Sequence, residues 1–399
     1  MDLSEVDLLD SAIFASERDH DVFRLLRDRS PVFWNPEPDG PGFWSLTRYG
    51  DVAAASRDHR RLGSEEGTQI ASRRAEGELH SIHNMDEPGH TEMRKLIADQ
   101  FAPRAVLRWR PRIQEIIDSL LDEMVERGEC EFVEHAASRL PLLVLAELLG
   151  VPKPDAPLLL QWTNEMVTPD AGPLHAGEAQ VFARAQLFDY FHHLVKERRH
   201  HPADDLVTLL ARSCVGGRPL TERELDPYFL LLVVAGNETT RNLVSGGLWA
   251  LASTSGALER LRGCPDLLDT AVEEMLRWVS PVINMRRTAA CDIEWHGTAV
   301  SAGDKVVLWF GSANRDERVF PDPDQFKLDR RPNNHLAFGW GNHFCLGAHL
   351  ARLEVKLFFA ELLRRNLVVE VTEPPVRVMS NWFRGIKKLP VRVTEVVAA

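Results

Sequence analysis

The stretch FGWGNHFCLGAHLAR, residues 338–352, decides how the rest of this chain is interpreted. Its only cysteine, Cys345, stands between glycines directly before an amphipathic helical pattern. Backbone N–H groups at a helix start, together with the positive end of the helix dipole, stabilise an anionic sulfur and lower the pKa of a thiol. Gly341 and Gly347 are expected to let the backbone turn tightly and approach a flat cofactor, with Phe338 shielding the sulfur from water. Taken alone, a single intracellular cysteine is more often a buried structural residue.

Outside this stretch, helical spacing of the apolar residues dominates the chain. It extends over residues 105–127, 136–149, 178–199, 222–254, 265–279 and 348–365. Strand-like runs occur near residues 31–47, at 293–309 and in the tail 388–396. The sequence therefore predicts a mainly α fold with a small β-rich region built from sequence-distant pieces. Irregular segments between these elements are expected to be functional loops, at 62–89, 163–177 and 311–347.

Length and charge limit the classes of function. The 399 residues contain no Gly/Ser-rich linker or fixed-period repeat, so we expect one domain over residues 1–399. A net charge of -12 without a long basic stripe argues against a binder of nucleic acid or of anionic membranes. The start of the chain is acidic and no long apolar run occurs, which predicts no membrane insertion and a cytoplasmic location. The five cysteines lack CxxC spacing, which argues against a zinc site or a disulfide framework.

The pattern Phe-x-x-Gly-x-x-x-Cys-x-Gly at residues 338–347 resembles the heme-binding signature of the cytochrome P-450 family. The resemblance implies a soluble bacterial-type protein, a monomer with a single triangular-prism-like domain that binds heme b. It makes Cys345 the proximal iron ligand and His343 a contact of a heme propionate. It places further heme contacts at Phe338, Gly339 and Gly347.

A second motif, LLVVAGNETTRN at residues 231–242, resembles the family's oxygen-activating helix. Ala235 and Gly236 are expected beside the heme, because a glycine lets a helix pass close over a flat face. Thr239 can divert a backbone hydrogen bond and open the helix locally. Glu238 and Thr239 side by side can relay protons, which makes them the candidate catalytic residues. Alone, the motif could equally be a pair of threonines in an ordinary core helix.

A third group of motifs concerns charge. Glu274 and Arg277 lie three apart on one helical face and resemble the family's ExxR element, with Arg330 expected to complete an ion-pair network. As an isolated pair, Glu274 and Arg277 would more often be a solvated surface contact.

Heme carries two carboxylates and requires fixed cations. The segment MDEPGHTEMR, residues 85–94, resembles the family's propionate-binding HxxxR helix, with His90 and Arg94. The segment MRRTA, residues 285–289, resembles the strand whose arginine binds the other propionate, and the Thr-Ala after it favours Arg287 over Arg286. Each alone would more often be a surface residue. All of these motifs occur in the family's order between residues 85 and 347.

The resemblance implies a monooxygenase that takes dioxygen and electrons from NAD(P)H through external partners, a ferredoxin and a ferredoxin reductase. A docking surface is expected where four arginines follow the His90 helix, although a solvated basic helix face is an equal alternative. These are Arg104, Arg108, Arg110 and Arg112.

The substrate is expected to be small and mostly apolar. The AGNETTRN and NMRRTA stretches are most similar to actinobacterial members that oxidise sterols, terpenoids or branched lipids. Natural-product tailoring of a polyketide, cyclic dipeptide or aromatic compound, including radical coupling or desaturation, is the alternative. A non-catalytic heme-thiolate carrier or sensor is a third hypothesis, disfavoured by the Glu238–Thr239 pair. Pocket walls are expected at 62–84, 161–182, the helix before Gly236, 282–285 and 379–383.

Overall fold

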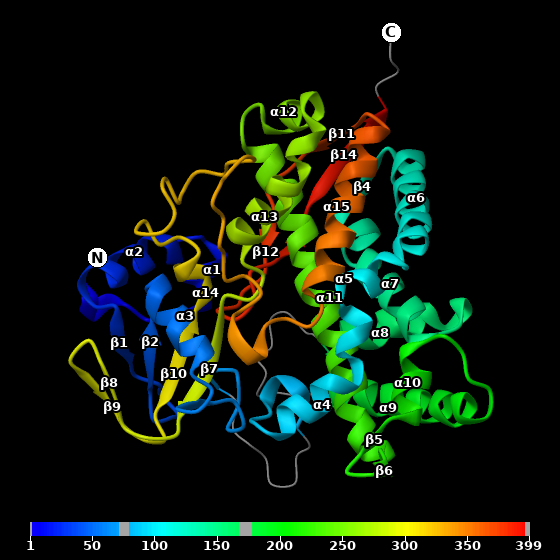
Figure 1. The fold of residues 1–399 in the computed structure, drawn as a ribbon. Coiled ribbons are helices and arrows are strands. Elements are labelled where there is room, and N and C mark those ends of the chain that lie inside the picture. The colour runs from blue at the N-terminus through cyan, green and yellow to red at the C-terminus, as the bar shows by residue number, and fades with distance from the viewer. Residues whose placement is uncertain (1, 72–79, 167–177, 396–399) are drawn as a thin grey trace.

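The computed structural model describes residues 2–71, 80–166 and 178–395 (Figure 1). Two parts of the predicted pocket walls, 72–79 and 167–177, lie outside the described residues. In Figure 1 the strands nearest the N-terminus and a few short helices occupy the left of the molecule, and the long helices occupy the centre and right. The fold is therefore a helical body with a smaller β-rich part beside it.

Helices account for most of the described chain. They are α1 (Ser11–Ala15), α2 (Asp19–Arg29), α3 (Tyr49–Arg57), α4 (Gly89–Ala98), α5 (Pro103–Leu107), α6 (Arg110–Arg127), α7 (Arg139–Leu149), α8 (Ala156–Met166), α9 (Glu178–His200), α10 (Leu206–Arg212), α11 (Glu222–Ser253), α12 (Ala257–Gly263), α13 (Leu268–Val279), α14 (Phe310–Ala313) and α15 (Ala348–Arg364). Each segment with helical spacing in the sequence forms helix, which confirms the mainly α prediction. The segment 105–127 divides at Trp109 into α5 and α6, with a proline in the first turn of each.

Some helices differ from the prediction. The irregular segment expected at 163–177 is wrong in its first residues, because α8 continues to Met166. The short helices α2, α3, α10 and α12 have no counterpart in the predicted set. Helices of seven to eleven residues contain too few turns for a 3.6-residue period to stand out from the sequence alone.

The largest sheet joins strands that are far apart in the sequence. Its order is β1-β2-β10-β7-β3, and only the β2–β10 pair is parallel. The strands are β1 (Val32–Asn35), β2 (Phe43–Leu46), β3 (Leu62–Gly63), β7 (Asn284–Ala289) and β10 (Lys305–Trp309). All five residues of β10 are buried, as expected for a central strand. The predicted β-rich region made of distant pieces is confirmed.

The remaining strands form smaller sheets. A three-stranded sheet has the order β11-β14-β4, and three two-stranded hairpins complete the set. Their bounds are β4 (Glu129–Glu131), β5 (Cys214–Val215), β6 (Arg218–Pro219), β8 (Ile293–Trp295), β9 (Thr298–Val300), β11 (Leu367–Val371), β12 (Val376–Arg377), β13 (Ile386–Lys388) and β14 (Pro390–Glu395).

The 32-residue helix α11 organises the helical core. Thr221 caps its start and forms a reciprocal capping box with Glu224. Near its end, a Cβ at Gly246 would lie 2.8 Å from Val279, and one at Gly247 would lie 2.9 Å from Met275. These glycines therefore let α11 and α13 approach closely, which brings the Glu274–Arg277 segment against the central helix. Among the described residues, no helix combines the length and apolarity needed to cross a membrane.

Candidate active site

The loop before α15 presents Cys345. The Cys345 amide donates to the Phe338 carbonyl over 2.9 Å, which closes the loop. Gly339 and Gly341 have φ of 69° and 75°, so the predicted tight turn requires glycine at Gly341. Gly347 has an ordinary φ of -81° at the start of α15, so its backbone angle does not require glycine. A Cβ at Gly347 would meet no described heavy atom within 4 Å, which leaves this side of the loop open.

Three groups favour a negative charge on the Cys345 sulfur. Burial raises the pKa of the thiol, whereas the Gly347 amide and the charges of Arg94 and Arg352 lower it. Arg94 also donates to the Phe344 carbonyl over 2.6 Å and is thereby fixed beside the loop. A coordinated metal ion deprotonates a thiol outright. An iron bound to this sulfur would therefore favour the thiolate more strongly than the amide and the arginines do.

Phe338 is held by residues that the sequence did not single out. The Arg352 guanidinium lies 4.5 Å from the centre of the Phe338 ring. Glu273 accepts from Arg352 over 2.7 and 2.9 Å and bonds His335 over 3.0 Å. Glu273 therefore ties α13 to α15 and fixes the ring expected to shield the sulfur. Arg352 ends the stretch 338–352 and Glu273 stands directly before Glu274, but only the fold brings them together.

The middle of α11 borders open space. Ala235 and Gly236 are exposed although they lie at the centre of a long core helix. A Cβ at Gly236 would meet only Leu145, at 3.9 Å. The Thr239 hydroxyl donates to the Ala235 carbonyl over 2.9 Å, as predicted, yet α11 remains helical from Glu222 to Ser253. The predicted local opening of the helix is therefore wrong for this state of the protein.

Glu238, the other candidate catalytic residue, is buried and pairs with Arg241 over 2.6 Å. Burial raises the pKa of Glu238, and the Arg241 charge lowers it. No hydrogen bond joins the side chains of Glu238 and Thr239, both of which lie in the described part of α11. A proton relay through both residues therefore requires the Glu238 carboxyl group to leave Arg241.

The four candidate propionate-binding residues gather at one end of the Cys345 loop. The His90 and His343 rings lie 4.2 Å apart, and Ser64 bonds His343 over 3.3 Å. Burial lowers the pKa of His343 to about 2, and nearby Arg287 acts in the same sense. Burial also lowers the pKa of Arg287 to about 10 and that of Arg94.

The arginines of this cluster differ from His90, whose Nδ1 bonds the Glu87 carboxylate over 3.3 Å. Among the described residues, no carboxylate bonds Arg94 or Arg287, and their side chains donate to the backbone carbonyls of Phe344 and Arg286. His90 is 2% exposed, and its Nε2 has no hydrogen-bond partner among the described residues. Buried cations and donors without partners are costly. A flat, mostly apolar group with two carboxylates, as heme is, fits both this cluster and the open space beside Gly236.

The structure separates Arg287 from Arg286. Successive residues of a strand point to opposite faces, and these two are neighbours on β7. Arg287 acts electrostatically on His343, whereas the charges of Glu37 and Glu66 act on Arg286. The geometry therefore favours Arg287 as the residue on the side of the histidines.

His83 joins the same cluster and was missed in the sequence. Burial lowers its pKa to about 4, with Arg287 and His80 acting in the same sense. Its Nδ1 bonds the Ser81 hydroxyl. No motif marks His83, since only the packing of residues 82–84 beside α4 brings it near Arg287.

Behind the loop, the predicted ion-pair network is present and fully buried. Arg277 donates to Glu274 over two bonds of 2.8 Å, and Arg330 donates to the same carboxylate over 2.9 and 3.1 Å. Both side chains of the Glu274–Arg277 pair are 0% exposed. The alternative of a solvated surface pair is therefore wrong. The two arginines also donate to backbone carbonyls between residues 314 and 325, which fixes the segment leading to the Cys345 loop.

The predicted pocket walls at 282–285 and 379–383 are joined to each other. The Ile283 amide donates to the Trp382 carbonyl over 2.8 Å, and the Asn284 side chain donates to the Asn381 carbonyl over 2.7 Å. The described part of the wall at 62–84 is also fixed, because Lys305 donates to the Ile70 carbonyl over 2.9 Å. These walls are built on β7 and β10 of the large sheet.

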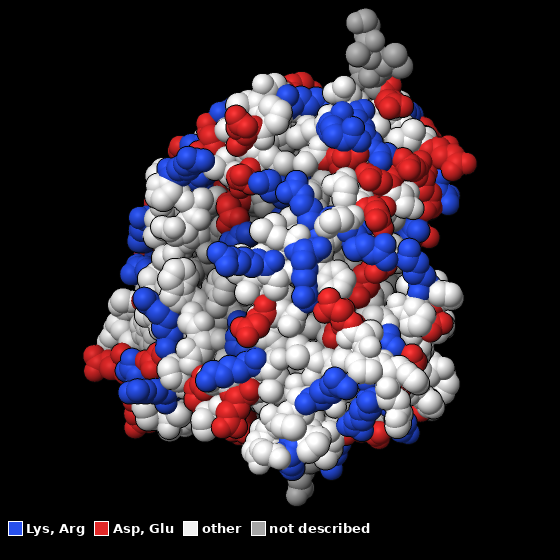
Figure 2. All heavy atoms as spheres, turned by 45° about the vertical axis from the view of Figure 1, so that its right-hand side comes forward, with Lys and Arg blue, Asp and Glu red and all other residues white. Residues whose placement is uncertain are grey.

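The predicted basic surface is only partly available. Lys and Arg gather across the middle of the face in Figure 2, and Asp and Glu are denser toward its upper right. Arg112 pairs with Glu115 and Glu147 over 2.8 and 3.2 Å. Arg104 and Arg110 are exposed and have no ion pair with a described residue.

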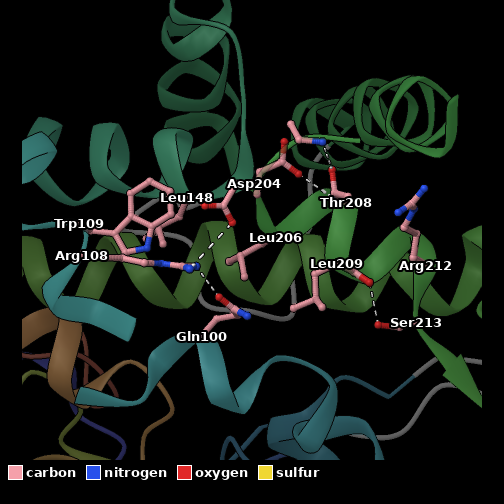
Figure 3. Close-up of a pocket in the computed structure, with 12 residues that line it drawn as sticks. Gln100, Arg108, Trp109, Leu148, Asp204, Leu206, Thr208, Leu209, Arg212 and Ser213 are labelled. Carbon is pink, nitrogen blue, oxygen red and sulfur yellow. Dashed lines mark hydrogen bonds and ion pairs between the residues drawn. The ribbon is translucent and has the colours of Figure 1, made fainter. Parts of the chain in front are cut away.

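Arg108 lies at a surface hollow of about 320 Å³ between α5, α7 and α10. Figure 3 shows its guanidinium directed toward Gln100 and Asp204, the latter at 3.9 Å. The hollow is separate from the Cys345 loop, and Arg108 is partly neutralised in it. Of the four predicted arginines, Arg104 and Arg110 therefore remain the most available to a partner.

Comparison with known proteins gives these features a context. Residues 266–390 match the family model described as Cytochrome P-450. A methyl-branched lipid omega-hydroxylase of Mycobacterium tuberculosis is 39% identical, over 93% of this chain and 90% of that protein. A steroid C26-monooxygenase of the same organism is 37% identical, over 98% of this chain and 97% of that protein. The solved structure of a Mycobacterium marinum cytochrome P-450, CYP268A2, in complex with pseudoionone has a TM-score of 0.90 at 35% identity, covering 97% of this chain and 98% of that one.

Proposed function

Since this chain belongs to the cytochrome P-450 family and is a monooxygenase, we propose that it hydroxylates a small, mostly apolar lipid. A sterol, a terpenoid or a methyl-branched chain is the favoured class of substrate. The two curated relatives are named for a methyl-branched lipid and a steroid, which supports this class. The most direct structural support is that Arg94 and Arg287 lie with His90 and His343 beside the Cys345 loop, and no described carboxylate bonds either arginine.

The family binds heme, and we propose heme b at this site. Cys345 would hold the iron, while Arg94, Arg287, His90 and His343 would hold the two carboxylates. Ala235, Gly236, Gly339 and Gly347 leave room for the flat ring, and Phe338 keeps water from the sulfur. When bound, the heme supplies dioxygen activation and oxidation of the substrate C–H bond.

The chain's own residues orient the substrate and exclude water. The walls at 282–285 and 379–383 are bonded to each other, so they offer a fixed surface to an apolar substrate. Val282, Met285, Met379, Trp382 and Phe383 supply its apolar side chains. Burial of a substrate against such a surface displaces water, which strengthens every hydrogen bond inside the site.

We propose that protons reach the site through Glu238 and Thr239. Thr239 Oγ1 donates its proton toward the substrate side and receives another proton from the Glu238 carboxyl group. For this transfer the Glu238 carboxyl group must first leave Arg241. The raised pKa of the buried Glu238 favours a carboxyl group that can take up a proton as well as release one. Thr239 Oγ1 returns to the Ala235 carbonyl when it is not donating toward the substrate side.

The family requires external electron donors, and we propose a ferredoxin and its NAD(P)H-dependent reductase in the cytoplasm. Arg104 and Arg110 offer exposed positive charge to an acidic ferredoxin. None of the five cysteines forms a disulfide, and three of them are exposed, which suits a reducing compartment. We further propose that residues 1–399 act as one domain, because the largest sheet joins β1 and β2 to β7 and β10.

The carbon monoxide spectrum of the reduced protein tests the site. A thiolate-bound heme is expected to give a strongly red-shifted Soret band, and Cys345→Ser is expected to lose it. Retention of the band in Cys345→Ser contradicts the assignment. Titration with sterols, terpenoids and branched fatty acids, followed by product analysis, then tests the substrate class. A spectral shift and a hydroxylated product are expected for at least one of these classes, and the absence of both for all of them contradicts the proposed substrate.

A further inference from the structure

Arg352 lies on α15, seven residues after Cys345, and its side chain reaches back toward the loop that contains the cysteine. Side chains of a helix point toward its N-terminus, which on α15 is the end beside this loop. The Arg352 guanidinium accordingly lies 4.5 Å from the centre of the Phe338 ring. The Phe338 carbonyl accepts the Cys345 amide over 2.9 Å. The positive charge of Arg352 is therefore in contact with the residue that bonds the cysteine backbone.

Glu273 holds this guanidinium in place. Its two carboxylate oxygens accept from Arg352 Nε and Nη2 over 2.7 and 2.9 Å, an arrangement that fixes the plane of the guanidinium. Burial raises the pKa of Glu273, but the bonds from His335 and Arg352 outweigh it and bring the pKa to about 2, so the carboxylate is ionised at neutral pH. The Arg352 and Glu273 side chains are 30% and 31% exposed, so water screens their charges only in part.

The charge of Arg352 reaches the sulfur. Burial raises the pKa of the Cys345 thiol, and the Arg352 charge is one of the influences that lower it, because a nearby cation favours the thiolate. Reduction of an iron bound to this sulfur would add one negative charge to the site. By the same Coulomb interaction, Arg352 would favour the reduced iron, and the negative charge of Glu273 would oppose it.

We propose that the Arg352–Glu273 pair sets the reduction potential of the iron held by Cys345, with the arginine raising the potential and the carboxylate limiting that rise. The proposal rests on the proposed function, since it requires heme iron at this sulfur. It assigns the pair an electrostatic effect on the iron in addition to its contact with the Phe338 ring. Arg352 and Glu273 act through the loop, so they are positioning residues and not catalytic residues.

The opposite charges of the pair give opposite predictions. Arg352→Met keeps a long side chain but removes the cation, so the potential is expected to fall. Glu273→Gln keeps the shape of the side chain but removes the anion, so the potential is expected to rise. In the double variant the two changes of charge cancel, and the potential is expected near the wild-type value. A pair that only holds the Phe338 ring predicts shifts of one sign in both single variants instead.

The experiment is a spectroelectrochemical titration of the heme-loaded full chain at low ionic strength, without carbon monoxide. Each single variant is expected to change the ratio of reduced to oxidised iron at a fixed potential by about fivefold, in the opposite directions given above. A tenfold change in this ratio corresponds to about 59 mV for a one-electron couple. Arg352→Lys retains the positive charge and is expected to stay within about twofold of wild type.

Arg364 supplies a matched control on the same helix. It donates to Glu361 over 2.8 and 2.6 Å, with the same two bonds that join Arg352 to Glu273. Arg364 follows Arg352 by twelve residues, which is about 18 Å along a helix and beyond the screening length of about 10 Å in dilute salt. Arg364→Met is therefore expected to leave the potential within about twofold of wild type. A shift as large as that of Arg352→Met would overturn the assignment to this pair.

The carbon monoxide band of each dithionite-reduced variant shows whether the thiolate ligand is kept. Shifts of the same sign in Arg352→Met and Glu273→Gln, or potentials equal to wild type in both, overturn the charge effect. If Arg352→Met does not retain heme, Glu273→Gln decides alone, because a potential that does not rise contradicts the proposal. A wild-type protein without the thiolate band overturns the proposed function instead.

Discussion

Two clusters of arginine, buried except for the half-buried Arg94, border the Cys345 loop, and they differ in how their charges are satisfied. In the first, Arg277 and Arg330 share the Glu274 carboxylate, and their other N–H groups reach backbone carbonyls. In the second, Arg94 and Arg287 reach only single carbonyls, and no described carboxylate bonds them. The comparison teaches that a buried cation paired within the protein completes the fold, whereas one without an anion marks a place for an anionic ligand.

The largest effect is expected from breaking the satisfied cluster. Glu274→Gln keeps the side-chain volume but leaves two buried guanidinium groups without their anion, which costs about 3–5 kcal/mol of unfolding free energy. Chemical denaturation of the heme-loaded protein measures this loss. Asp329→Asn is the control, because its pair with Arg260 is about half exposed and contributes under about 1 kcal/mol. Equal stability of the two variants would show that the network is not structural.

The unsatisfied cluster is expected to affect heme retention rather than folding. Arg287→Met removes a cation while filling its space, and a lost charged hydrogen bond of about 1.5–3 kcal/mol corresponds to roughly tenfold to hundredfold faster heme release. Transfer of heme to excess apomyoglobin measures the rate. Arg286→Met, on the opposite face of β7, is expected to change it less than about threefold. If heme release were faster in Arg286→Met than in Arg287→Met, the propionate contact would belong to Arg286.

These two clusters also show what the sequence can reveal. The Glu274–Arg277 pair was visible because its partners lie three residues apart on one helix, and helical geometry fixes their meeting. The Arg352–Glu273 contact and the place of His83 were not visible, because they depend on how α13, α15 and α4 pack. The Glu238–Arg241 pair has the same helical spacing, but spacing alone does not tell whether a carboxyl group faces a relay partner or an arginine. Long helices were predicted well, and short helices such as α10 were missed because few turns give little periodicity.

Glu354, on α15, is a buried acidic group to compare with the two arginine clusters. The Oε2 atom of its carboxyl group has no described partner. Burial raises its pKa from 4.5 to about 8. Between these pH values the folded state binds more protons than the unfolded state, so this group lowers stability progressively as pH rises from about 4.5 to 8. Glu354→Gln cannot ionise, and it is expected to gain a few kcal/mol over wild type, at most about 5, at pH values above 8, with little difference near pH 5. Denaturation curves at the two pH values measure this, and a pH-independent difference contradicts it.

The smallest effect on stability is expected at Thr239, which separates catalysis from structure. Among the described residues its hydroxyl bonds the Ala235 carbonyl of its own helix and no other group, so Thr239→Val costs under about 1 kcal/mol. Heme retention and the substrate-induced spectral shift are expected to stay as in wild type, because the shape of the side chain is kept. The product formed per NAD(P)H is expected to fall severalfold, with the missing electrons recovered as hydrogen peroxide. Thr239→Ser restores the hydroxyl and is expected to restore the yield, which a purely structural role for the methyl group does not explain. An unchanged product yield in Thr239→Val would show that the proton relay runs through another residue.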